Sequence, residues 1–127
     1  MSLHKTVLLV DDAPSVCVAL RRLLRDEHTT VYTARNGAEA LTLLTELGEA
    51  FDLVVSDLDM PVMTGDALHK ACAGLLAVGK IRKFLIMTGG TVDEKALMYL
   101  SAAEVEIIEK PFGVKAFLDV YRRHVRP

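Results

Sequence analysis

The sequence predicts an α/β protein in which a doubly wound, five-stranded parallel sheet lies between two layers of helices. Apolar stretches of strand length alternate five times with amphipathic stretches of helical periodicity. The connections are long enough for helical crossovers, which favours parallel strands. Five units are too few for an eight-stranded barrel, so an open three-layer sandwich remains. Strand order 2-1-3-4-5 is the common solution at this size.

The first half of the chain supplies two predicted strands and two helices before its central strand. Thr6–Val10 is apolar throughout and predicts a buried strand, whereas Thr29–Ala34 is more polar and predicts an edge strand. The helix between them is expected to begin at Pro14, because proline is favourable in a first helical turn. Asn36, three residues before a glutamate, forms a capping-box pattern that opens a helix ending at Gly48.

The most strongly apolar strand begins at Phe51 and is expected to be buried on both faces. Pro61 cannot continue a central ladder, so the strand must end before it and Asp57 lies where the strand surfaces. The remaining elements expected are a helix from Thr64 or Gly65 to Leu75, a strand Phe84–Thr88, a helix opened by a capping box of Thr91 and Glu94, a strand Val105–Ile108 and a helix around Val114–Tyr121.

Composition excludes several classes of protein. The chain has 127 residues, the length of a single domain spanning 1–127, in which Met1 to Leu3 resemble an expression scar and no output domain is expected. Its net charge of −2 offers no electrostatic footprint for nucleic acid, and no apolar run approaches the length of a membrane span. Cys17 and Cys72 lack metal-ligand spacing, which predicts buried free thiols and a cytoplasmic location.

Polar residues follow the predicted strands where each strand ends. In a parallel sheet the carboxyl ends share one edge, and ligands bind where the strand order reverses. With order 2-1-3-4-5, the first and third strands are neighbours at that point. The residues expected to gather there are Asp11, Asp12, Asp57, Thr88 and Lys110, with Asp59 nearby. The histidines His4, His28, His69 and His124 fall outside this crevice and receive no role in it.

The expected cluster has a definite chemistry. Carboxylates about 4 Å apart repel by a few kcal/mol at the rim of a protein, so such a cluster favours a cation. Oxygen ligands with room for water and phosphate favour Mg²⁺. A lysine and a hydroxyl supply positive charge and a donor for phosphoryl oxygens, and an aspartate can itself be the nucleophile. Each residue alone has an ordinary interpretation as a cap, a solvated side chain or a structural hydroxyl.

Four motifs stand out along the chain: Val7-Leu8-Leu9-Val10-Asp11-Asp12, Ser56-Asp57-Leu58-Asp59-Met60-Pro61 with Met63-Thr64-Gly65, Met87-Thr88-Gly89, and Glu109-Lys110-Pro111-Phe112. As a set, these motifs closely resemble the receiver domain of two-component response regulators, over essentially the whole chain. The resemblance implies a flavodoxin-like fold.

The resemblance implies a role for each site residue. Asp57 is expected to be the phospho-acceptor, Asp12 a direct Mg²⁺ ligand, and Asp11 a partner that holds a metal-bound water. Asp59 is expected to offer its backbone carbonyl to the metal.

The resemblance assigns the remaining two residues to the phosphoryl group. Thr88 would turn its hydroxyl toward it, and Lys110 would pair with it. The bond from Lys110 to Pro111 is expected to be cis. Ile107 departs from the family pattern, because relatives often carry Tyr or Phe three residues before this lysine. This departure puts the aromatic readout of phosphorylation in doubt, but it leaves the phosphorylation chemistry intact.

The implied partner is a sensor histidine kinase or a phosphotransfer domain that donates from phosphohistidine. Phosphorylation would shift the face formed by the fourth helix, fifth strand and last helix. The domain would catalyse its own phosphorylation and dephosphorylation without being a turnover enzyme. It fits either a free-standing receiver or, as the motifs favour, the receiver of a hybrid histidine kinase. Homodimerisation is compatible with the resemblance.

Two alternatives remain at this point. Asp57-Leu58-Asp59 also resembles the Asp-x-Asp motif of aspartyl-phosphate phosphatases, although Pro61 stands where that family prefers Thr or Val and no cap domain is expected. A degenerate receiver that acts only as a binding module is the other alternative, although the acidic set and Lys110 are complete.

Overall fold

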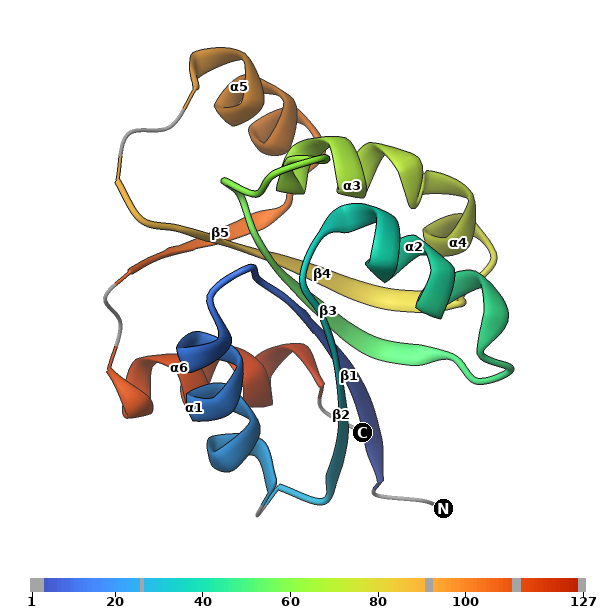
Figure 1. Cartoon of the computed structure of the whole chain (residues 1–127), viewed down its shortest axis with the longest axis vertical. Helices are drawn as coiled ribbons and strands as arrows, with labels where there is room; N and C mark the ends of the chain where they lie inside the picture. The colour runs from blue at the N-terminus through green and yellow to red at the C-terminus, as the bar shows by residue number, and fades with distance from the viewer. Residues whose placement is uncertain (1–3, 26, 91–92, 111–112, 126–127) are drawn as a thin grey trace.

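The five predicted strands form one sheet in the order β2-β1-β3-β4-β5, and every neighbouring pair is parallel (Figure 1). The structure is a computed structural model that describes residues 4–25, 27–90, 93–110 and 113–125. The strands are β1 (Lys5–Val10), β2 (Thr29–Ala34), β3 (Phe51–Asp57), β4 (Ile81–Thr88) and β5 (Glu106–Glu109). The predicted fold class and strand order are confirmed.

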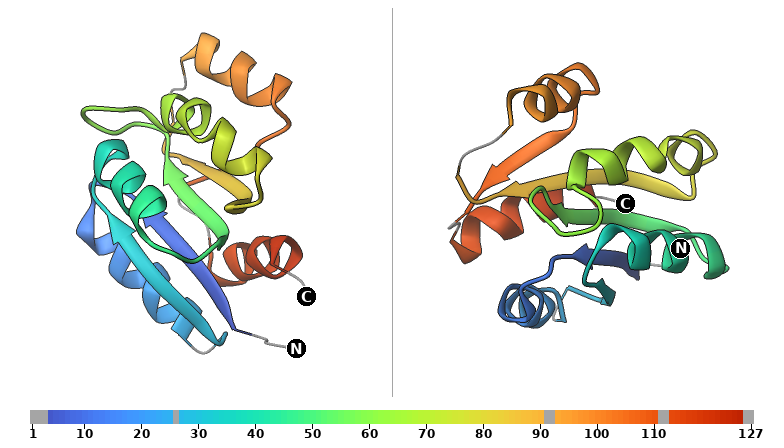
Figure 2. Two further views of the ribbon diagram at one scale, coloured as in Figure 1. Left: turned by 90° about the vertical axis from the view of Figure 1, so that its right-hand side faces the viewer. Right: turned by 45° about the horizontal axis from the view of Figure 1, so that its top comes forward.

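Helices cover both faces of the sheet and complete a three-layer sandwich (Figures 1 and 2). The helices are α1 (Pro14–Arg25), α2 (Gly37–Glu46), α3 (Gly65–Ala71), α4 (Ala73–Ala77), α5 (Glu94–Ala102) and α6 (Val114–His124). The buried side chains of α1 and α6 pack together in one core cluster, and those of α2, α3 and α5 pack in another. Each cluster lies on its own face of the sheet.

Strand β1 shows why the core has two halves. Its apolar side chains alternate between the faces, so that Leu8 and Val10 belong to the cluster under α2, α3 and α5, and Val7 and Leu9 to the cluster under α1 and α6. All four side chains are fully buried. Residues of β2 are mostly half-buried, which confirms the prediction of an edge strand from its polar sequence.

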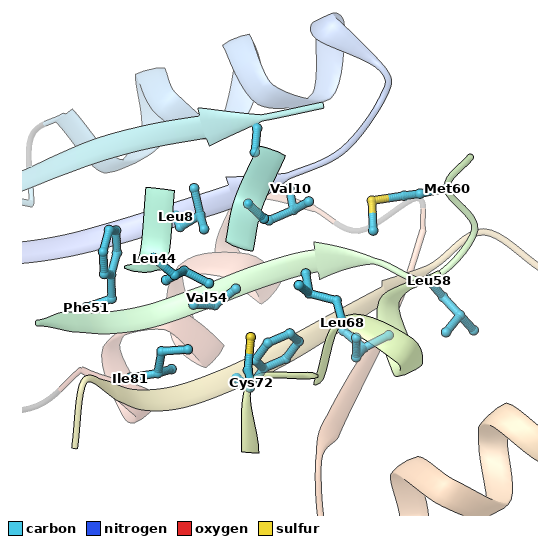
Figure 3. Packing of buried hydrophobic residues seen from close by; sticks show 14 of the residues in the cluster. Leu8, Val10, Leu44, Phe51, Val54, Leu58, Met60, Leu68, Cys72 and Ile81 are labelled. Atoms are coloured by element: carbon cyan, nitrogen blue, oxygen red, sulfur yellow. The ribbon is translucent and has the colours of Figure 1, made fainter. Parts of the chain in front are cut away.

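The larger cluster extends along β3 and ends next to the acidic edge of the sheet (Figure 3). Phe51 and Val54 of β3 lie in it, and Leu58 and Met60 continue it into the loop that follows the strand. Burying a leucine or phenylalanine side chain contributes roughly 1.5–3 kcal/mol to folding. The loop after Asp57 is therefore anchored by apolar burial.

Two helix predictions differ from the structure. The helix expected from Gly65 to Leu75 is broken at Cys72, whose amide is shared between the carbonyls of Leu68 and His69. This tightening ends α3 and begins α4 as a separate short helix. The cap of α5 is Asp93, whose carboxylate accepts from the amide of Ala96 at 3.1 Å, so the expected cap at Thr91 is wrong. Thr91 itself lies outside the described residues.

Strand β4 begins three residues earlier than expected, at Ile81. The start was missed because the charged residues Arg82 and Lys83 interrupt the apolar pattern by which the strand was recognised. Both side chains are exposed, and Arg82 forms an ion pair with Asp52 of β3 at 3.5 Å. Ile81 nevertheless pairs with Phe51 and is buried, because β4 begins level with β3.

Other expectations concern residues away from the sheet edge. Asn36 caps α2 by accepting from the amide of Glu39 at 2.9 Å, as the capping-box pattern predicted. Cys17 and Cys72 are free and buried, also as predicted. Among the described residues, no helix combines the length and the apolar character needed to cross a membrane.

Gly65 allows α3 to begin against the end of β3. A Cβ atom at this position would lie 2.5 Å from the backbone oxygen of Asp57 and 3.0 Å from the side chain of Ile86. The amide of Gly65 also donates to the carbonyl of Leu58 at 2.8 Å, which closes the loop between strand and helix. A side chain at residue 65 would therefore push α3 away from the acidic edge.

We expect Gly65→Ala to lower the free energy of unfolding by roughly 1–3 kcal/mol, because the added methyl group meets backbone that cannot yield. Urea unfolding measures this change. Gly74→Ala is the matched control, since open space surrounds Gly74 and alanine favours helix; we expect it to leave stability unchanged or to raise it. Equal effects of the two substitutions would contradict this account of Gly65.

Candidate functional site

The register of the sheet brings the ends of β1 and β3 to the same level. Val10 pairs with Ser56, so the residues that follow them, Asp11 and Asp57, emerge from adjacent strands. Strand order reverses between β1 and β3, because successive connections run to opposite sides of β1. The two carboxylates therefore meet at the crevice where ligands bind in folds of this kind.

Three carboxylates gather in this crevice. The side chains of Asp11, Asp12 and Asp57 each offer an oxygen, and these oxygens lie within 4.8 Å of one another. Asp11 is only 1% exposed and Asp57 7% exposed, whereas Asp12 is open to solvent. The amide of Ala13 donates to Asp11 Oδ1 at 2.8 Å, which fixes that carboxylate at the start of α1. The predicted acidic cluster therefore exists.

Lys110 is the cation of the cluster. Thr88 pairs with Glu109 in the β4–β5 ladder, and Lys110 comes directly after Glu109, as predicted. Its Nζ atom lies 3.0 Å from Asp11 Oδ2 and 3.4 Å from Asp57 Oδ1. One ammonium group thus contacts two of three carboxylates, which leaves negative charge uncompensated at the edge of the sheet.

This arrangement perturbs the pKa values of the buried groups. Burial raises the pKa of Asp57 above its usual value, the nearby Asp11 carboxylate raises it further, and Lys110 only partly offsets both. Burial by itself would lower the pKa of Lys110, but the hydrogen bond and charge of Asp11, together with Asp57, raise it. The lysine therefore stays charged, while Asp57 carries its own negative charge at a cost.

The donor set suits a hard divalent cation. All three side chains present oxygen, and carboxylate oxygens are the ligands that Mg²⁺ prefers in proteins. A divalent cation would also supply the positive charge that Lys110 alone does not. The residues that could hold it are Asp11, Asp12 and Asp57.

Thr88 contributes a hydroxyl with no structural use. It is the last residue of β4, one position beyond the partner of Asp57 in the β3–β4 ladder. Its side chain is buried, and its Oγ1 finds no hydrogen-bond partner among the described residues. An unpaired buried hydroxyl costs free energy, so this group is better explained by an acceptor that arrives during function.

Asp59 and Ile107 lie at the margin of the site. The carboxylate of Asp59 is exposed and stands outside the cluster of three, so only its backbone remains as a candidate ligand. Ile107 of β5 is half-buried against the core cluster under α5, where it pairs with Ile86. An aliphatic side chain at this position cannot exchange a hydrogen bond.

Sequence reasoning missed two residues that shape the crevice. Ser56 is buried, and its hydroxyl donates to the carbonyl of Asp57 at 2.9 Å. Gly65 was assigned only to the helix start, although its close approach to Asp57 sets the loop geometry. Ser56 directly follows the apolar run Leu53-Val54-Val55 and precedes Asp57, which was a readable signal. The close approach at Gly65 had none, because it depends on the distance between β3 and α3.

Several residues without a predicted role in the crevice lie in ordinary structural positions. Phe117 is buried in the core under α6. Arg122 pairs with Glu27 at 2.8 Å, and Arg123 pairs with Glu106 at 2.7 Å. Pro111, Phe112 and Arg126 fall outside the described residues.

Comparison with known proteins identifies the family. Residues 7–122 match the family model of the response regulator receiver domain. The sensor kinase CckA of Brucella abortus is 36% identical over 110 residues, which cover 87% of this chain and 11% of that protein. The transcriptional regulatory protein KdpE of Mycobacterium tuberculosis is 32% identical over 120 residues, which cover 94% of this chain and 50% of that protein. The chain thus spans half or less of the length of these relatives.

Solved structures agree with these matches. The chemotaxis response regulator CheY4 of Vibrio cholerae has a TM-score of 0.80 and 31% identity, over 95% of this chain and 98% of that one. The signal receiver domain of a histidine kinase from Syntrophus aciditrophicus has a TM-score of 0.77 and 25% identity, over 95% of this chain and 89% of that one. The chain therefore belongs to the receiver-domain family of two-component systems and is a phosphoryl-accepting signalling module.

Proposed function

We propose that Asp57 accepts a phosphoryl group from a phosphohistidine of a partner protein, in a reaction that depends on Mg²⁺. Asp11, Asp12 and Asp57 would hold the metal through their carboxylates, and Asp59 through its backbone carbonyl. One observation carries this proposal: three carboxylates converge within 4.8 Å at the edge of the sheet, beside a lysine and an unpaired hydroxyl.

The reaction transfers phosphorus between two nucleophiles. A carboxylate oxygen of Asp57 attacks the phosphorus atom, and the bond from phosphorus to the imidazole nitrogen breaks, so that the histidine leaves with the bonding electron pair. When bound, Mg²⁺ supplies positive charge to the phosphoryl oxygens. Asp57 is suited to the attack because it lies at the end of a rigid buried strand.

Lys110 and Thr88 would stabilise the charge that spreads over the transferred group. Lys110 contacts Asp11 at 3.0 Å as well as Asp57 at 3.4 Å, so Asp11 would still hold it when Asp57 is modified. Its ammonium group would pair with one phosphoryl oxygen as the carboxylate of Asp57 is consumed. The hydroxyl of Thr88 would donate to another oxygen and so gain the partner that it lacks.

The partner proposed is a sensor histidine kinase or a phosphotransfer domain. A groove of about 370 Å³ runs between α1 and the start of α6 and reaches Lys110. Its lining is largely apolar and includes Leu20, Leu23 and Val114. Because this groove adjoins the reactive edge, it suits a helix that carries the donor histidine. We place this exchange in the cytoplasm, where buried free thiols such as Cys17 stay reduced.

We infer that the domain transfers phosphoryl once per signal and is not a turnover phosphatase. The receiver match spans residues 7–122, and it favours this function over the phosphatase and over a degenerate module that only binds. Residues 1–127 would act as one receiver unit. A small acyl phosphate should then label the protein once instead of being hydrolysed steadily.

We expect Asp57→Asn to abolish labelling by a small acyl phosphate in the presence of Mg²⁺, because an amide is not a nucleophile toward phosphorus. Intact mass spectrometry should show the gain of a single phosphoryl group in the wild type and none in the variant. Asp59→Asn is the control, since that exposed carboxylate lies outside the cluster, and it should label as the wild type does. Equal mass gain in Asp57→Asn would mean that another residue is the acceptor.

We expect Thr88→Val to separate stability from function. Valine has the shape of threonine but removes the unpaired hydroxyl, so the free energy of unfolding should stay level or rise by about 1 kcal/mol. Labelling of Asp57 should slow by about 10²-fold, the scale of losing one donor to a reacting group. Urea unfolding and timed mass spectra measure the two quantities. Labelling at the wild-type rate would remove Thr88 from the mechanism.

The raised pKa of Asp57 predicts a pH dependence of stability without metal. A carboxyl group whose pKa is raised in the folded protein binds its proton more tightly there than in the unfolded chain. The free energy of unfolding therefore falls as the pH rises from the unfolded-state pKa through the raised, folded-state pKa. We expect Asp57→Asn to be more stable than wild type at neutral pH in chelator, by on the order of 1 kcal/mol. The difference should vanish in acid, below the usual carboxyl pKa.

Urea unfolding across pH tests this expectation, with exposed Asp59→Asn as the control that should follow the wild type. Mg²⁺ should stabilise the wild type more than Asp57→Asn, because the metal offsets the charge of Asp57. A variant that is less stable than the wild type at neutral pH in chelator would show that Asp57 stabilises the fold.

A further inference from the structure

A hydrogen bond joins two helices on the α5 side of the sheet and has no part in the phosphoryl chemistry. Nδ1 of His69 in α3 lies 2.7 Å from the hydroxyl oxygen of Tyr99 in α5. The imidazole packs edge-on against Phe84 of β4, with ring centres 5.0 Å apart. Nζ of Lys70 lies 4.8 Å from the centre of the Tyr99 ring. The bond is thus set in a defined aromatic environment.

The direction of the bond depends on the tautomer of His69. Burial lowers the pKa of His69, so its imidazole is neutral at neutral pH. A neutral ring has one nitrogen that accepts, and the Tyr99 hydroxyl can donate to Nδ1 while the ring proton resides on Nε2. His69 is only half-buried, so it lies outside the fully buried core. The bond therefore helps to hold α5 in place, and the core can fold without it.

Helix α5 has few other anchors. It stands at one end of the molecule with α3 as its helical neighbour (Figures 1 and 2). Its buried residues are Ala96 and Leu100, and its outer residues Leu97 and Met98 are exposed. No other side-chain hydrogen bond joins the described residues of α5 to another helix or strand. Among the described residues, the Tyr99–His69 bond is therefore the side-chain hydrogen bond that links α5 to a neighbouring helix.

The same helix is close to the phosphorylation site along the chain. Strand β4 ends at Thr88 and α5 begins at Glu94, so only a short stretch of sequence separates the Thr88 hydroxyl from α5. Ile107 packs in the same core cluster as Ala96 and Leu100, but its side chain offers no hydrogen bond. Because the bond between Tyr99 and His69 joins α3 to α5, a movement of α5 relative to α3 would change it.

We propose that Tyr99 and His69 are positioning residues whose hydrogen bond holds α5 in its unphosphorylated position, and that the bond breaks when Asp57 carries a phosphoryl group. This inference rests on the function proposed above. A contact that is made in the unphosphorylated state and lost in the phosphorylated state stabilises the first state and opposes the change to the second. By thermodynamic linkage, such a contact also weakens the binding of a ligand that favours the phosphorylated state. Removing the bond should therefore tighten binding of a phosphoryl analogue by about 2- to 10-fold, the scale of one hydrogen bond.

The test measures the affinity of the protein for beryllium fluoride, an analogue of the phosphoryl group, at a fixed Mg²⁺ concentration. Tyr99→Phe keeps the ring that faces Lys70 and removes only the hydroxyl, and we expect its dissociation constant to fall by about 2- to 10-fold. His69→Phe removes the other partner and should act in the same direction. The double variant should bind no more tightly than either single variant, because one bond is lost in all three.

Tyr32→Phe is the matched control. Its hydroxyl also donates a hydrogen bond, to Glu49 Oε1 at 2.6 Å, but Tyr32 lies on the edge strand β2, far from α5 in the order of the sheet. Its affinity for beryllium fluoride should equal that of the wild type. Thermal unfolding of every variant establishes that it is folded.

A second readout reports the bond itself. The imidazole nitrogen signals of His69 in NMR spectra should move, on saturation of the wild type with beryllium fluoride, toward their positions in unliganded Tyr99→Phe. Wild-type affinity or weaker binding in Tyr99→Phe, with the His69 signals unmoved in the wild type, would make the bond purely structural and overturn the inference. Failure of the wild type to bind the analogue or to label at Asp57 would instead overturn the proposed function.

Discussion

The repulsion among three carboxylates at the end of β1 and β3 is the constraint on which the rest of the site depends. Asp11 and Asp57 are almost fully buried, and a single lysine contacts both of them. Burial raises the pKa of Asp57, the Asp11 carboxylate raises it further, and Lys110 offsets the two only in part. A cluster short of positive charge favours a divalent cation, and in the function proposed above that cation would in turn offset the negative charge of an incoming phosphoryl group.

The fold tolerates this charge because apolar burial surrounds it. Both faces of β1 and β3 are covered, and Leu58 and Met60 extend the core beneath the loop that follows Asp57 (Figure 3). Gly65 closes that loop at a distance that no side chain permits. The acidic groups are therefore held by rigid strand ends, and little reorganisation is needed when a ligand binds.

The departure at Ile107 connects the site to the rest of the molecule. An aliphatic residue there can fill the core cluster, but it cannot change hydrogen-bond partners when Thr88 moves. A side-chain hydrogen bond of α5 lies instead between Tyr99 and His69, on the side of α3. In the mechanism proposed above, the chemistry of phosphorylation and its readout therefore depend on separate residues.

The sequence by itself determined the class of fold, the strand order and the members of the acidic cluster, because strand periodicity and the topology of parallel sheets place Asp11, Asp57 and Lys110 at one edge. Tertiary structure alone decided the unpaired state of the Thr88 hydroxyl, the early start of β4 at Ile81 and the bond from Tyr99 to His69. These features depend on distances between elements far apart in the chain, which local patterns of residues do not encode.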